Sequence, residues 1–395
     1  MPLVLAILFL SCSQLASQIF LPAMPDIALS LNITKSQLQQ IMMYYFICLG
    51  VSQLVVGPLC DYLGNRAVFL FCQILFILGS LTAGFAHNEV MFALGRILQG
   101  LGAAAPLLIS RTILASSLEG KTLKSATASL SIAASLVAVI APWFGGVIAT
   151  QFNWQILFLV VTVYFLSIWF IGFFFLSNNK AIAVTQKLKF LAMFNEYKNL
   201  IIQSKFLSIA AFKWVPTFLY LTSQIYYPFE LQEKFNLSAA QYGTAMMIPT
   251  LGLVLGTVLA KILQKKLSFK IMLLMFWPLI FLSGLTLYVL PFSLFSSLFS
   301  YSLLMIAFGT YYPCCIHLIV TSFKQSAATA SALVGAIELL CFSLLAMLMC
   351  TYLITSYVAL SLLYLVSSLV LLFSWFVMNT KVNLSQKNTT LNVVS

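Results

Sequence analysis

The chain has 395 residues, of which 62% are hydrophobic and only 7% are charged, and its formal net charge is +12. A soluble domain carries about 25% charged residues, so no water-soluble core could enclose this much apolar surface. The apolar stretches are continuous and do not alternate with polar residues, which excludes a transmembrane β-barrel. The composition therefore indicates a helical membrane protein.

Twelve apolar stretches have about the 20 residues that a helix needs to cross the hydrocarbon layer of a membrane. In chain order, the predicted spans are 3–24, 38–60, 66–86, 90–111, 125–150, 154–177, 206–228, 239–260, 269–290, 293–319, 327–350 and 353–378. We therefore predict an all-α membrane protein with twelve transmembrane helices.

Basic residues predict the orientation of these spans, because cytoplasmic loops collect lysine and arginine. With the N-terminus inside, sixteen of the 20 basic residues fall in inner segments, and only Lys35 and Lys234 fall in outer loops. The remaining two, Arg96 and Lys213, lie within spans. This bias predicts that both termini are cytoplasmic, and it explains the net charge without a nucleic-acid partner.

The longest loop divides the chain into two halves. We predict a six-helix bundle at 1–178, a cytoplasmic linker with a membrane-surface helix at 179–205, a second six-helix bundle at 206–380 and a polar cytoplasmic tail at 381–395. NITKSQ at 32–37 and NLSAAQ at 236–241 share a capping-box pattern at an offset of 204 residues. A duplicated six-helix unit would place the two copies at this separation.

The loop between the second and third spans reads GPLCDYLGNR, residues 57–66. Gly57 permits a close helix approach, and Gly64 suits a tight turn. Asp61 can pair with Arg66 or cap a neighbouring helix. The loop is therefore either a charged turn at the membrane surface or a latch that closes in one conformation and opens in the other.

The fifth span contains APWFGG, residues 141–146. Pro142 cannot donate to the carbonyl four residues back, so it bends the helix, while Gly145 and Gly146 allow close packing against another helix. The alternatives are an ordinary membrane-helix kink and a tightly packed helix that prevents leakage.

Polar side chains recur at helical spacing inside several spans, so we expect their faces to line a wet interior. These residues are Gln14 and Gln18 in the first span, Arg96 and Gln99 in the fourth, Lys213, Thr217, Tyr220, Gln224 and Tyr227 in the seventh, and Tyr301 and Tyr312 in the tenth. For any single one, hydrogen bonding between helices is the alternative. A mixture of amides and phenols with few charges suits a medium-sized amphipathic organic molecule.

Arg96 carries the strongest of these signals. An arginine at the bilayer centre costs about 2.5–3.5 kcal/mol on insertion scales, so it needs a partner or a wet cavity. We expect Arg96 to face the cavity, where water and hydrogen-bond acceptors offset its burial.

Several motifs now point to one family. GPLCDYLGNR resembles the loop signature of the major facilitator superfamily, although Asn65 departs from the usual basic residue. GRILQGLGAAA, which begins at Gly95, resembles the signature of the fourth helix, and APWFGG resembles the antiporter signature of the fifth. FLPAMP at 20–25 and AATASAL at 327–333 resemble the bicyclomycin and chloramphenicol resistance (Bcr/CflA) drug-export subfamily. The resemblance implies two six-helix bundles related by pseudo-two-fold symmetry, with spans one, four, seven and ten around the cavity.

The resemblance also implies proton coupling, but the expected proton site is missing. Relatives usually carry an aspartate where this chain has Gln18, and an amide cannot titrate. Glu338 is the only acid well inside a predicted span and Lys213 the only lysine, at heights of about 16 Å and about 12 Å from the inner face. We hypothesise that Glu338 couples transport to protons with Lys213 as its partner; a static ion pair is the alternative, and Asp26 is the fallback proton site.

The leading interpretation is a secondary exporter of drug-like molecules, driven by proton entry, in a bacterial inner membrane. Export of an endogenous metabolite such as a siderophore is the alternative. A membrane enzyme or sensor is remote, because the two histidines and eight acids are scattered and no phosphate-binding glycine loop is present. We expect a monomer in the lipid bilayer that binds a small-molecule substrate, with no cofactor and no metal.

Overall fold

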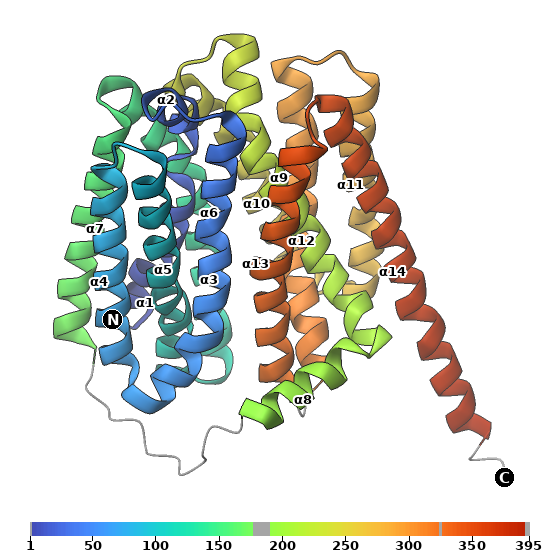
Figure 1. Cartoon of the computed structure of the whole chain (residues 1–395). Helices are drawn as coiled ribbons and strands as arrows, with labels where there is room; N and C mark the ends of the chain where they lie inside the picture. Colours follow the sequence, from blue (N-terminus) through green and yellow to red (C-terminus); the bar gives the residue numbers. More distant parts are fainter. Residues whose placement is uncertain (1, 177–189, 324–325, 392–395) are drawn as a thin grey trace. The chain divides into compact units, whose positions relative to one another are not determined.

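The computed structural model describes residues 2–176, 190–323 and 326–391, and regular structure in these residues is entirely helical (Figure 1). The first half contains α1 (Pro2–Gln18), the short 3-10 helix η1 (Leu21–Ala23), α2 (Met24–Ser30), α3 (Lys35–Leu63), α4 (Asn65–Gly84), α5 (Glu89–Ser117), α6 (Gly120–Gln151) and α7 (Trp154–Phe175). The rest contains α8 (Phe190–Ile201), α9 (Ser204–Phe235), α10 (Ala239–Leu263), α11 (Phe269–Val289), α12 (Leu294–Ser322), α13 (Ala327–Tyr352) and α14 (Tyr357–Leu391).

Eleven segments of the described chain are long and apolar enough to cross a membrane, and they coincide with eleven of the twelve predicted spans. The seventh predicted span corresponds to α9, whose lysine and other polar residues interrupt its apolar run. Large apolar side chains are exposed along the helices, for example Phe174 on α7 and Phe373 on α14, as a lipid environment requires. The predicted all-α membrane fold is confirmed.

Three helices differ in their ends from the predicted spans. The first span was predicted to run to 24, but α1 ends at Gln18, where the chain enters the 3-10 turn around Pro22. Helix α9 extends seven residues beyond the predicted end at 228. Helix α14 continues to Leu391 into the predicted polar tail, because no glycine or proline interrupts this segment.

The two predicted capping boxes are both present. The Thr34 hydroxyl accepts the backbone N–H three residues on at 3.2 Å, and the glutamine there accepts the Thr34 N–H at 2.8 Å. Ser238 makes the same two hydrogen bonds, at 3.2 and 2.9 Å. The asparagines that open the two segments, Asn32 and Asn236, both have left-handed φ values, 51° and 48°. This shared geometry supports the predicted duplication.

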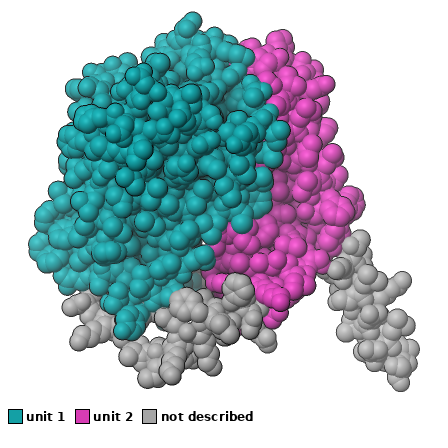
Figure 2. Space-filling model, viewed as in Figure 1, with its two compact units in different colours: residues 1–187, 221–251, 339–355 teal, residues 188–220, 252–338, 356–395 magenta. Residues whose placement is uncertain are grey.

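The described chain forms two compact units, coloured separately in Figure 2. Unit 1 comprises residues 1–187, 221–251 and 339–355. Inside it, α5 packs against α1, α3 and α4, and α6 packs against α1 and η1. Unit 1 also contains the ends of α9, α10 and α13 that are predicted to be outermost.

Unit 2 comprises residues 188–220, 252–338 and 356–395. Inside it, α11 packs against α12 and α14, and the hydroxyls of Ser283 and Ser300 join α11 to α12 at 3.0 Å. Residues 179–189 of the predicted linker lie outside the described residues, whereas α8 occupies the linker's remainder. The division into two six-helix bundles stays a prediction.

Candidate functional site

Unit 2 holds a buried ion pair. Lys213 on α9 places its Nζ 2.5 Å from Oε2 of Glu338 on α13. The Thr217 hydroxyl, one helical turn along α9, donates to the other carboxylate oxygen at 2.7 Å. The lysine Nζ also lies 4.8 Å from the centre of the Tyr312 ring on α12. Three helices therefore contribute side chains to this ion pair and its surroundings.

Both charged side chains of this pair are buried, which strengthens the attraction between them. Lys213 is 5% exposed and Glu338 is 8% exposed, so water screens their attraction very little. The carboxylate has a partner for each oxygen, and the ammonium has the carboxylate and an aromatic face. Removing one charge from such a pair leaves the other buried and uncompensated, which costs more than the intact pair gains.

In unit 1, Arg96 on α5 is fully buried between two aromatic rings. Its guanidinium lies 4.0 Å from the Phe20 ring centre and 4.5 Å from the Tyr45 ring centre. One terminal nitrogen donates to Oε1 of Gln99 at 2.6 Å, and the Gln99 amide donates to the Ser80 hydroxyl at 2.8 Å. The Arg96 Nε and Nη2 groups have no hydrogen-bond partner among the described residues.

Arg96 is predicted to face a wet cavity, whereas the structure encloses its side chain between the two rings. The adjoining cavity holds about 10 Å³, which is the space of a single water molecule. Its lining comprises Ala16, Ile19, Phe20, Arg96, Gln99, Leu157, Phe158 and Val161. The two rings and the Gln99 acceptor surround the guanidinium, where the prediction expected water and hydrogen-bond acceptors.

The connection between α3 and α4 contains the tight turn that is predicted at Gly64. Gly64 has a φ of 84°, a left-handed conformation that makes the tight turn. The Arg66 guanidinium stacks 4.9 Å from the Phe173 ring centre on α7. At Gly57, a Cβ would meet no atom of the described residues within 4 Å, so no close helix approach is seen there. The Asp61 side chain, and with it the predicted pair to Arg66, lies outside the described part of the structure.

The APWFGG segment lies in the interior of α6 and packs tightly. A Cβ on Gly145 would collide with the carbonyl oxygen of Ile19, where α1 breaks. A Cβ on Gly146 would collide with the carbonyl oxygen of Ala239, at the start of α10. The two glycines therefore permit backbone contacts that any larger residue would prevent, as their sequence predicts.

The remaining predicted polar residues have different environments. Gln18, Gln224, Tyr227 and Tyr301 are buried, and Gln14, Tyr220 and Tyr312 are half-buried. Asp26 is exposed in the first turn of α2, a position that suits an acidic side chain.

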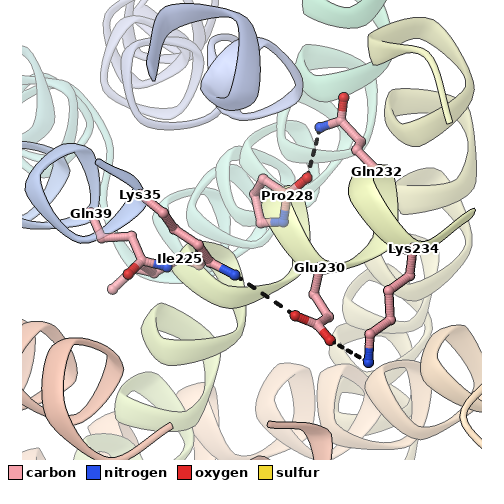
Figure 3. A network of polar contacts seen from close by, with 7 residues as sticks. All are labelled: Lys35, Gln39, Ile225, Pro228, Glu230, Gln232 and Lys234. Atoms are coloured by element: carbon pink, nitrogen blue, oxygen red, sulfur yellow. Dashed lines mark hydrogen bonds and ion pairs between the residues drawn. The ribbon is translucent and has the colours of Figure 1, made fainter. Parts of the chain in front are cut away.

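One buried acid, Glu230 on α9, is not among the predicted site residues, and it is only 8% exposed. Its carboxylate lies 2.8 Å from Lys234 and 3.7 Å from Lys35 (Figure 3). The residue lies just past the predicted end of the seventh span at 228. The three-and-four spacing of the polar stripe would have found it, because Glu230 follows Tyr227 by three residues.

Comparison with known proteins decides the family. The model of the Major Facilitator Superfamily matches residues 6–346. The chain belongs to this superfamily. Its fold also resembles the crystal structure of a D-xylose–proton symporter, with a TM-score of 0.72, 14% sequence identity, and coverage of 94% of this chain and 95% of the other. A partially occluded, inward-open structure of the Escherichia coli xylose transporter XylE gives the same TM-score at 12% identity, over 95% of this chain and 96% of the other.

Curated relatives of this superfamily member match shorter segments. Multidrug resistance protein D of Escherichia coli is 30% identical over 161 residues, 41% of each chain. Multidrug resistance protein MdtL of Escherichia coli is 26% identical over 229 residues, 58% of each chain. The matched segments thus span less than two thirds of these relatives. Family and relatives indicate a multi-pass membrane transporter rather than an enzyme. The Bcr/CflA subfamily stays a prediction.

Proposed function

We propose that the protein is a proton-coupled exporter of amphipathic small organic molecules. The buried Lys213–Glu338 pair is the observation that supports this proposal most strongly. The names of two relatives, multidrug resistance proteins D and MdtL, support drug-like cargo. The positive-inside bias supports an orientation with both termini in the cytoplasm of a bacterium, and the expected location is the inner membrane.

The coupling follows from charge balance. When Glu338 is ionised, it neutralises Lys213 and accepts the Thr217 hydroxyl. When Glu338 takes a proton, Lys213 is left as a buried cation without its counter-charge. That state favours a rearrangement in which Lys213 reaches water or an acceptor on the cargo. Loss of the proton on the other side restores the pair and resets the transporter.

The other proposed elements have separate roles. Arg96 and Gln99 form a buried polar centre in unit 1. A rearrangement that uncovers this centre would expose the Nε and Nη2 groups of Arg96 to acceptors on the cargo. Gln18 on α1, Gln224 and Tyr227 on α9, and Tyr301 on α12 contribute further buried amides and phenols. The loop from Gly57 to Arg66 acts as a conformational latch, and Pro142, Gly145 and Gly146 limit leakage.

The test is transport in inverted membrane vesicles from a strain without its own efflux pumps. Fluorescent amphipathic compounds should accumulate when the vesicle lumen is acidified, and a protonophore should abolish the accumulation. Profiling drug resistance and secreted metabolites of intact cells distinguishes drug cargo from an endogenous metabolite. Absence of uptake for every compound class under a pH gradient would contradict the proposal.

A further inference from the structure

The two lysines that the orientation analysis assigns to outer loops converge on one carboxylate. Lys35 begins α3, Lys234 lies near the end of α9, and Glu230 lies between their ammonium groups (Figure 3). All three residues belong to unit 1. The predicted exceptions to the positive-inside pattern are therefore the two lysines that contact the buried Glu230.

The two ion pairs differ in what they connect. Lys234 and Glu230 are four residues apart on the same helix, so their contact at 2.8 Å stabilises α9 alone. The contact of Glu230 with Lys35, at 3.7 Å, joins α9 to α3. Lys35 is further held by aromatic faces of α9, since its Nζ lies 5.7 Å from the Tyr226 ring centre and 5.4 Å from that of Phe229.

Two amide contacts strengthen this junction. Gln39, one turn after Lys35 on α3, donates its side-chain N–H to the Ile225 carbonyl at 3.2 Å (Figure 3). Gln232 donates to the Pro22 carbonyl in the 3-10 turn that follows α1, at 3.0 Å. Both glutamines are at most 9% exposed. The end of α9 is thus bonded to α3 and to the break after α1 by an ion pair and two buried hydrogen bonds.

We propose that Lys35, Glu230 and Lys234 form an outer gate, in which Glu230 is the positioning residue that keeps the outer end of the cargo pathway closed. This inference rests on the proposed function, because export requires α3 and α9 to separate at the outer face. Separation breaks the Lys35–Glu230 contact and leaves the Lys234–Glu230 contact intact. Lys234 therefore keeps Glu230 charge-compensated in the open state, so that the gate can close again.

A native cysteine reports on this gate. Cys350 of α13 is 7% exposed, and its Sγ lies 3.6 Å from the Thr222 carbonyl on α9, two turns before Glu230. We would measure the labelling of Cys350 by a membrane-impermeant maleimide in right-side-out vesicles. The variant Cys350→Ser provides the background from other cysteines, and membrane abundance is measured for every variant.

In Glu230→Gln and in Lys35→Gln, Cys350 should be labelled about threefold to tenfold faster than in the wild type, because each substitution removes a partly buried ion pair. The matched control, Lys234→Gln, should change labelling less, since its pair lies within one helix. Exchanging the charges in Lys35→Glu with Glu230→Lys should return labelling toward the wild-type rate. Raised salt should speed labelling of the wild type, because both lysines are partly exposed.

The gate proposal is wrong if Cys350 is labelled at the wild-type rate in Glu230→Gln. It is also wrong if the charge-exchange variant is labelled as fast as the single variants. The labelling needs neither cargo nor a pH gradient. A failure of the proposed proton-coupled export would leave these rates unchanged, and a failure of the gate would leave pH-driven uptake intact, so the two outcomes are distinguishable.

Discussion

Lys213 and Glu338 lie on different helices of the second half of the chain, and they meet at 2.5 Å inside unit 2. A carboxylate and an ammonium this deeply buried depend on each other for charge compensation. The contact also depends on Thr217 and Tyr312, which occupy the second carboxylate oxygen and one side of the lysine. Loss of either charge would therefore leave its partner buried without a counter-charge.

The pair predicts an asymmetry in stability. Lys213→Leu alone or Glu338→Leu alone should destabilise the protein by about 3–5 kcal/mol, because each leaves an uncompensated buried charge. The double variant should recover most of this loss. Thermal unfolding in detergent measures the three variants, and equal destabilisation by the single and double variants would contradict the coupling.

Arg96 should be required for transport. Arg96→Lys keeps the charge but loses the planar group that stacks between Phe20 and Tyr45. Transport should fall at least about tenfold at normal membrane abundance, because lysine cannot present the same fork of donors. Gln99→Glu is a useful companion, since it keeps an acceptor for residue 96. Retained transport in Arg96→Ala would show that the arginine only fills space.

Asp61 should control conformation rather than bind cargo. Asp61 lies in the last turn of α3, directly before the tight turn at Gly64. Asp61→Asn should abolish transport and leave equilibrium binding of a fluorescent cargo within a few-fold of the wild type. Loss of binding, with an unchanged conformational equilibrium, would refute the latch.

Gly145 should tolerate no larger residue. A Cβ there would collide with the Ile19 carbonyl, so Gly145→Leu must separate α6 from the break after α1. We expect a strong loss of correctly folded protein in the membrane, measured by size-exclusion chromatography of a fluorescent fusion. Gly57→Leu is the matched control, because its position is open. Equal yields from both variants would show that the close contact is dispensable.

Much of the fold could be predicted because it depends on local signals. Apolar length predicts the spans, and the capping patterns at Thr34 and Ser238 correctly predict two helix starts. Matching heights along their helices brought Lys213 and Glu338 together as candidates. These features require only helical geometry and the cost of buried charge.

Other features depend on which side chains neighbouring helices supply. No pattern in the sequence indicates that Phe20 and Tyr45 enclose Arg96, because three separate segments must first pack together. Glu230 was missed because the hydropathy of α9 falls before the helix ends. Lys35 is an exception to the positive-inside pattern in the sequence. Its contact with Glu230 is visible only in the folded structure.

Proton-driven uptake into inverted vesicles by Glu338→Gln decides whether Glu338 couples transport to protons. The amide keeps the size of the carboxyl and can still accept the Thr217 hydroxyl, but it cannot take up or release a proton. This variant should lose its dependence on the pH gradient and still exchange bound cargo across the membrane. Uptake by Glu338→Gln that is driven by the pH gradient as fully as in the wild type would contradict proton coupling through Glu338.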